Sequence, residues 1–389
     1  MEDWLYYLLS FTLCLALHLL LRAVTGKLAA PPRLPPGSSA VTVIIGPLLF
    51  LGRSNFAVKP IIRAARRCVV ESVMAVQREF STSALGFQAL GMYPAVTKLV
   101  FRRRWRQMLS LRRRQEELYI PLIRAREARH RHGVAGEEGV AASYVDSLLT
   151  LRIPENGGRN LTEGEMASLC AEFFVAGTES TAAVAQWIMA NLVARPEIQA
   201  KLRQEIRAVV GVGGGGVQEE HLRMPYLRAV VLEALRLHPP GHFVRPHAAV
   251  PDDDDDAAAA LIDGFHVPRH ATVNFTVADM ALDEAVWPDA ARFRPERFLP
   301  GGEGADVDLT GGREIKRMPF GAGRRACPGV ALALLHLECL VGNLVAASEW
   351  RDVAGEAVNF AEKQEISVVM RRPLRAVAMP CHTILQIKI

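Results

Sequence analysis

Residues 320–329 read Phe-Gly-Ala-Gly-Arg-Arg-Ala-Cys-Pro-Gly, and this stretch decides the fold. One cysteine, Cys327, lies in a loop whose glycines let the backbone turn sharply and approach a flat ligand closely. Two arginines precede the cysteine and bring positive charge beside it. A thiolate presented in this way suits a soft metal ion held inside a large anionic cofactor. The alternative is a buried structural cysteine, which is the commoner role of a lone cysteine.

The spacing Phe-x-x-Gly-x-Arg-x-Cys-x-Gly resembles the haem-binding loop of the cytochrome P-450 monooxygenases, especially their plant microsomal members. The resemblance implies a mainly helical fold with a small β region, in which haem is buried between two helices. Cys327 would be the axial thiolate ligand of the iron, and Arg325 would pair with a haem propionate. The other loop residues that would contact haem are Phe320, Gly321, Gly323 and Gly329.

An almost wholly apolar stretch, residues 166–195, predicts a buried helix well before the cysteine loop. Residues 162–165 read Thr-Glu-Gly-Glu, a capping box in which a threonine hydroxyl and a glutamate satisfy the first free N–H groups of a helix. Pro196 is expected to end the helix, because proline cannot continue the hydrogen-bond ladder.

The middle of this helix, residues 176–181, reads Ala-Gly-Thr-Glu-Ser-Thr. A carboxyl group beside hydroxyls is costly in a buried helix unless it has partners or a role. Taken alone, the hexapeptide is best interpreted as a satisfied polar kink. Upstream of such a cysteine loop it resembles the oxygen-activation motif of the same family, so Glu179, Ser180 and Thr181 would relay protons to oxygen.

Glu233 and Arg236 lie three residues apart near the end of another predicted helix, residues 226–237, and therefore share one face. An isolated pair of this kind is usually a surface ion pair that contributes little to the stability of the protein. Together with Pro-Glu-Arg-Phe at 295–298, the pair resembles the Glu-Arg-Arg triad of the family. The resemblance implies that Glu233, Arg236 and Arg297 lock the cysteine loop.

The resemblance also implies partners. One oxygen atom would enter an apolar small organic substrate, with electrons supplied by NADPH through a flavoprotein reductase. Lys316, Arg317 and Arg324 are candidates for the basic face on which the reductase docks. Either His247 or Arg245 would contact a haem propionate, and the sequence does not choose between them.

An apolar run at residues 4–21 is long enough to cross a bilayer once. Acidic residues before it and basic residues after it favour a retained anchor, with the rest of the chain in the cytosol, over a cleaved signal peptide. We expect a transmembrane anchor at 1–22, a basic and proline-rich hinge at 23–37, and a haem-thiolate domain at 38–389 on the endoplasmic reticulum membrane.

The chain carries a formal net charge of +5, and much of its positive charge falls in residues 98–131. Nucleic-acid binding is disfavoured, because this segment lacks the interleaved aromatic residues on which bases stack. It resembles the helices that roof the substrate pocket, with Leu109, Leu118, Leu122 and Ile123 expected to face inward. The six cysteines form no Cys-x-x-Cys pair, which argues against a disulfide framework and for a reducing compartment.

The remaining elements are expected from local patterns. Helices are predicted at 69–80, 98–131, 197–210 and 330–344, and strands at 262–267 and 271–278. The alternating runs 365–370 and 375–379 predict a terminal β-hairpin.

The chain departs from the family after about residue 68. The Trp-x-x-x-Arg pattern that would reach the haem propionates is absent, as are the helices that would surround it. We therefore expect an internal deletion near 68–69. The competing hypothesis is a catalytically inactive, membrane-anchored relative.

Overall fold

A computed structural model describes residues 67–92, 94–131, 143–154, 158–211, 216–244, 246–248, 260–268, 271–309 and 315–381. All of them belong to one compact unit of the chain, Pro47–Ile389. The predicted anchor and hinge, residues 1–37, lie outside the described residues.

The described part is mostly helical, with a small β component, as the sequence predicted. The α-helices are α4 (Arg67–Met92), α5 (Pro94–Val100), α6 (Arg102–Arg131), α7 (Tyr144–Thr150), α8 (Glu163–Ala194), α9 (Pro196–Val210), α10 (Pro225–Leu237), α11 (Val277–Ala281) and α12 (Val330–Ala347). The 3-10 turns are η2 (Glu219–His221), η3 (Pro295–Phe298) and η4 (Gly323–Arg325). The strands are β1 (Arg152–Ile153), β2 (Arg159–Asn160), β3 (His247–Ala248), β4 (Ala260–Ile262), β5 (Phe265–Val267), β6 (Thr272–Val273), β7 (Ser348–Asp352), β8 (Glu362–Gln364), β9 (Val368–Met370) and β10 (Ala376–Pro380).

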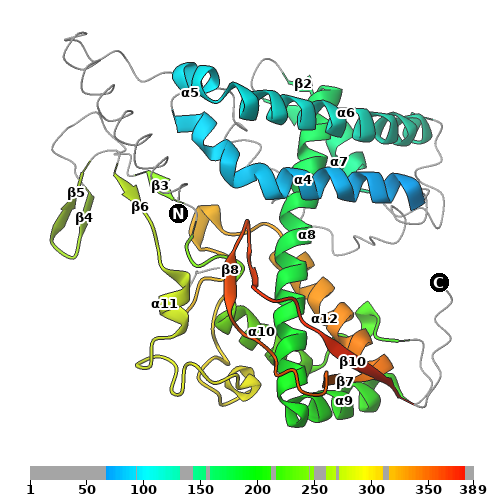
Figure 1. Ribbon diagram of the computed structural model, residues 1–389, viewed down its shortest axis with the longest axis vertical. Helices are drawn as coiled ribbons and strands as arrows, with labels where there is room; N and C mark the ends of the chain where they lie inside the picture. Colours follow the sequence, from blue (N-terminus) through cyan, green and yellow to red (C-terminus); the bar gives the residue numbers. More distant parts are fainter. Residues whose placement is uncertain are drawn as a thin grey trace. The chain divides into compact units, whose positions relative to one another are not determined.

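The long helix α8 is the element against which most of the other α-helices pack (Figure 1). Its start is the predicted capping box: the Thr162 hydroxyl accepts from the Glu165 N–H at 3.3 Å, and the Glu165 carboxylate accepts from the Thr162 N–H at 2.8 Å. Its end is set by Pro196, which opens α9 in the first-turn position where a missing N–H costs nothing.

The two halves of α8 pack in separate hydrophobic cores. The N-terminal half packs with α4, α6 and α7, in a core that includes Tyr119, Ile123 and Met166. The C-terminal half packs with α9, α10 and α12, in a larger core that includes Ile188, Leu202 and Val341. α8 is therefore buried on both sides of its middle and ties the two cores together.

The inward face of α6 differs in part from the prediction. Leu109 and Leu122 are 44% and 42% exposed, so their predicted inward orientation is wrong. Leu111, Tyr119 and Ile123 are 1%, 4% and 1% exposed and form the buried stripe instead. Their spacing of four and eight residues follows the helical repeat, which rotates the two exposed leucines to the outer side.

The terminal strands also pair differently from the prediction. The alternating runs 365–370 and 375–379 contribute strands to two separate sheets rather than forming one hairpin. β9 pairs antiparallel with β8, and β10 pairs antiparallel with β7. The second β-like run, 271–278, yields only the two-residue β6 before α11 begins. Alternation predicts where a strand lies, whereas its partner depends on the packing around it.

Among the described residues, α12 is the one helix with the length and apolar composition of a membrane span. It packs on α8, α9 and α10 inside the larger core. This packing explains the apolar composition of α12 as that of a helix in the domain core.

Candidate functional site

The cysteine loop closes on itself through backbone hydrogen bonds. The Cys327 N–H donates to the Phe320 carbonyl at 2.7 Å, so the two ends of the loop are joined. Gly321 and Gly323 have φ of 69° and 64°, values that residues with a Cβ rarely adopt. Gly329 then caps α12, and its carbonyl accepts from the Ala333 N–H at 2.8 Å. The turn itself thus requires glycine at positions 321 and 323.

The thiol of Cys327 is presented at the surface of the described residues. Desolvation by the surrounding loop raises its pKa, and the backbone N–H of Gly329 opposes that rise by hydrogen-bonding to the sulfur. The thiolate is therefore disfavoured in this loop until a cation binds it. An accessible sulfur with one backbone donor fits an axial ligand position better than a structural role.

The other predicted loop residues divide by exposure. Arg324 and Arg325 are exposed, so either guanidinium is free to meet a carboxylate outside the loop. Phe320 is half-buried and packs against the larger core. A Cβ at Gly323 would meet nothing within 4 Å, which shows that this side of the loop faces open space.

The middle of α8 is exposed to solvent, whereas the parts of the helix on either side of it are buried. Ala176, Gly177 and Thr178 are exposed, although α8 is buried on either side of them. A Cβ at Gly177 would also meet nothing within 4 Å. The prediction of a helix buried along its whole length is therefore wrong at its centre. An apolar helix face left uncovered there fits a site for a flat apolar group.

The proposed proton-relay residues lie beside this opening. Glu179, Ser180 and Thr181 are all half-buried. The Ser180 hydroxyl donates to the Ala176 carbonyl at 2.8 Å, the usual local bond of a serine inside a helix. Val184, less than one turn beyond Thr181, already belongs to the core shared with α12. That core therefore begins within about one turn of the relay residues.

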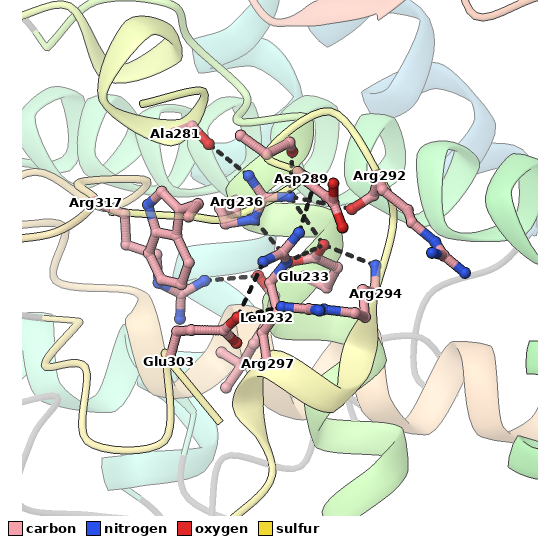
Figure 2. A network of polar contacts seen from close by, with 12 residues as sticks. Leu232, Glu233, Arg236, Ala281, Asp289, Arg292, Arg294, Arg297, Glu303 and Arg317 are labelled. Carbon is pink, nitrogen blue, oxygen red and sulfur yellow. Dashed lines mark hydrogen bonds and ion pairs between the residues drawn. The ribbon is translucent and has the colours of Figure 1, made fainter. Parts of the chain in front are cut away.

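The predicted triad is assembled in the structure (Figure 2). Arg236 donates to both oxygens of Glu233, at 2.7 and 2.9 Å. The Nε atom of Arg297 lies 3.4 Å from the same carboxylate. All three side chains are fully buried, so each charge depends on its partners. The contact predicted between residues 233, 236 and 297 is confirmed.

The triad also holds the backbone of the segment that leads from α11 to η3. Arg236 donates to the carbonyls of Ala281 and Ala290, and Arg297 donates to the carbonyl of Asp289 at 2.7 Å. The Glu233 carboxylate accepts from the Arg294 N–H at 2.8 Å. These hydrogen bonds fix the backbone conformation of the irregular segment between α11 and η3 relative to α10.

Three predicted positions need correction or stay open. Arg317, predicted to lie on the docking face, is only 2% exposed and belongs to the triad network. Nothing in its basic neighbourhood, beside Lys316, signals burial; the apolar residues that follow it are the one hint. The backbone of His247 lies in β3, opposite Val273 of β6, and Arg245 lies outside the described residues. The contact of either with a propionate stays a prediction.

The chain is similar to known cytochrome P450 proteins. The family described as Cytochrome P450 matches residues 68–379. Cytochrome P450 89A9 of Arabidopsis thaliana is 42% identical over 327 residues, which cover 81% of this chain and 61% of that protein. Cytochrome P450 78A1 of Zea mays is 40% identical over 241 residues, covering 61% and 42%. Flavonoid 3'-monooxygenase of Arabidopsis thaliana is 33% identical over 248 residues, covering 62% and 47%.

The alignments thus span between 42% and 61% of the length of these three relatives. The matched region, 68–379, includes α8, the triad and the cysteine loop. On the family match and these relatives, the chain belongs to the cytochrome P450 family.

Proposed function

We propose that the chain is a haem-thiolate monooxygenase that acts on an apolar small organic substrate. The observation that carries this proposal is the glycine-built loop that presents an accessible Cys327 sulfur directly before α12. When bound through a cysteine thiolate, haem supplies the activation of dioxygen, from which one atom enters the substrate and the other leaves as water.

Several described residues would bind haem, each through a different type of contact. Cys327 would be the axial ligand, and the hydrogen bond from the Gly329 N–H would help to stabilise its thiolate. Gly321 and Gly323 would allow the backbone to approach the ring face. Arg325, which is exposed, would pair with a propionate through its planar guanidinium. His247 remains a candidate for the same role.

Residues on α8 would hold and transfer the protons that the reaction needs. The Ser180 hydroxyl, which donates to the Ala176 carbonyl, would turn outward to give its proton and take another from Glu179 or Thr181. The exposed backbone around Gly177 would leave room for a small molecule. We expect the substrate to contact the same open stretch of helix.

We also propose the partners and location. Electrons would come from NADPH through a flavoprotein reductase that docks near Lys316 and Arg324, of which Arg324 is exposed. Residues 1–22 would anchor the chain in the endoplasmic reticulum membrane, 23–37 would be the hinge, and 38–389 the catalytic domain.

The surface of α5 supports association with a membrane. Val96, Leu99 and Val100 are 36%, 68% and 66% exposed on this short helix. Exposed arginines at 102 and 103 follow directly in α6. Apolar side chains beside cations suit the boundary between lipid tails and anionic head groups.

The absorption spectrum of the reduced protein under carbon monoxide tests the proposed function. The full-length chain, purified with haem and reduced under carbon monoxide, should show the red-shifted Soret band of thiolate-ligated haem. Cys327→Ser should abolish this band, whereas Cys339→Ser on α12 should keep it. A folded wild-type protein that binds haem without the band would overturn the proposal and favour the inactive, membrane-anchored relative.

A further inference from the structure

Arg317 is a buried arginine that lies ten residues before Cys327 in the chain. Its side chain contacts two elements of the triad region, and Figure 2 shows the contact with Leu232. The Nη1 atom donates to the Leu232 carbonyl of α10 at 2.6 Å. The guanidinium carbon lies 4.2 Å from the ring centre of Phe298 in η3, a cation–π contact.

Both contacts adjoin members of the triad. Leu232 directly precedes Glu233, and Phe298 directly follows Arg297. Arg317 therefore contacts both α10 and η3, the two elements that the triad joins, and its position depends on how they are placed relative to each other. It is attached, through two residues of chain, to the first residue of the cysteine loop.

The burial of this charge is expensive. Desolvation lowers the pKa of Arg317 to about 9, although the Glu233 carboxylate favours the charged form. Among the described residues, its Nε and Nη2 atoms have no hydrogen-bond partner. An apolar side chain of similar length would fill the same space without this cost. Stability of the core alone therefore does not explain an arginine here.

The backbone beyond Arg317 leads directly into the loop. The Met318 carbonyl accepts from the Gly321 N–H at 3.1 Å, and the Phe320 carbonyl accepts from the Cys327 N–H at 2.7 Å. Met318 itself is buried. A displacement of residue 317 would therefore also displace the Phe320 carbonyl, which accepts the hydrogen bond from the Cys327 N–H.

We propose that Arg317 is a positioning residue that fastens the base of the cysteine loop to the triad and so holds Cys327 in place. Arg317 acts through the loop and touches no reacting atom. The inference rests on the proposed haem-thiolate function for its consequence, and on the contacts above for its geometry.

The first measurement is hydrogen exchange of the full-length chain, followed by mass spectrometry over residues 318–329. Arg317→Met keeps the volume but removes the donor and the charge. It should speed exchange of this segment by about tenfold, the effect expected for losing one hydrogen bond from a charged group. Exchange equal to that of the wild type would overturn the proposal.

The matched control is Arg203→Met. Arg203 is also mostly buried, with 11% of its side chain exposed, and donates to the Ser348 carbonyl at 3.0 Å. Its loss should lower thermal stability while exchange over 318–329 stays at the wild-type rate. Equal acceleration in both variants would show a general loss of stability and would also overturn the proposal.

Arg317→Lys keeps a charge and one donor but lacks the planar group, and should restore only part of the protection. It also keeps the proposal falsifiable if Arg317→Met does not fold: full protection with lysine would show that the guanidinium contacts are dispensable.

The second measurement is the carbon monoxide spectrum of the same variants. The ratio of thiolate-ligated to thiol-ligated haem should fall by about tenfold in Arg317→Met and stay unchanged in Arg203→Met. An unchanged ratio in Arg317→Met would overturn the role for Cys327. A wild type without the red-shifted band would refute the proposed function instead, and the exchange rates would still decide whether Arg317 fastens the loop.

Discussion

The Glu233 carboxylate holds the Arg236 guanidinium at both of its oxygens, at 2.7 and 2.9 Å, and neither side chain is exposed to solvent. The same carboxylate is also the nearest anionic group to Arg297, 3.4 Å from its Nε atom. One buried anion thus compensates two buried cations. The arrangement makes Glu233 the group on which the fold of the region before the cysteine loop depends.

Replacing Glu233 by glutamine should therefore destabilise the protein strongly. Arg236 would stay buried without a compensating charge, and Arg297 would keep only the partly exposed Glu303, 3.6 Å away. The expected cost is about 3–5 kcal/mol in the free energy of unfolding. Denaturant unfolding would measure the loss. Glu356→Gln is the control, because its pair with Arg375 is exposed and should be worth less than about 1 kcal/mol. Similar losses in both variants would contradict the assigned role of Glu233.

Ser180→Ala should uncouple NADPH consumption from product formation if Ser180 relays protons. Removing one positioned acid–base group should slow the productive step by about a hundredfold. The readout is product formed per NADPH oxidised in the reductase-supported reaction, with hydrogen peroxide as the unproductive outlet. Folding should be unaffected, because the lost bond to the Ala176 carbonyl is local to the helix.

Ser168→Ala provides the control for this experiment. Ser168 lies on the same helix and makes the same type of bond, to the Gly164 carbonyl at 3.0 Å. It lies about two turns before the open stretch of α8, so coupling should stay at the wild-type value. If Ser180→Ala kept full coupling as well, the relay would not pass through Ser180.

The capping box of α8 should respond to acid. Hydrogen bonds from Arg159, and then from Thr162, lower the pKa of Glu165 from 4.5 to about 2, against an opposing effect of burial. A carboxyl group whose pKa is lower in the folded state stabilises the fold above its unfolded pKa. Its contribution should be fully present above about pH 4.5 and should be lost as the pH falls toward 2.

Glu165→Gln tests this window, because glutamine keeps the reciprocal cap and does not titrate. The difference in unfolding free energy between the wild type and the variant should be constant above pH 4.5 and shrink below it. The side chain is 39% exposed, so the difference should be modest and should weaken with added salt. A difference that stays constant down to pH 2 would show that Glu165 is not the titrating group.

Much of the α8 region could be predicted from the sequence, because its signals are local. The capping box, the apolar composition and Pro196 define the helix within its own residues. The spacing of Glu233 and Arg236 places them on one face, and a resemblance to a known triad supplied Arg297. The glycines at 321 and 323 likewise identify a turn that needs positive φ.

Other features depend on what lies nearby in space. The strand pattern at 375–379 is visible in the sequence, whereas its partner β7 lies in an earlier part of the chain and is known only from the structure. Arg317 and Arg324 are alike in sequence, yet one is buried on Phe298 and the other is exposed. The apolar residues after Arg317 are the one local hint of this difference, because burial is decided mainly by residues far along the chain.

Local sequence determined that a cysteine lies on a glycine-rich loop before an apolar helix, where α8 begins and ends, and that Glu233 and Arg236 share one helix face. These properties arise from backbone freedom, capping and periodicity, which act over a few residues. Only the tertiary structure decided that the middle of α8 is left open between two cores, and that Arg317 joins the triad. Both depend on which surfaces meet when the chain folds, and a buried charge or an uncovered helix face exists only once they have met.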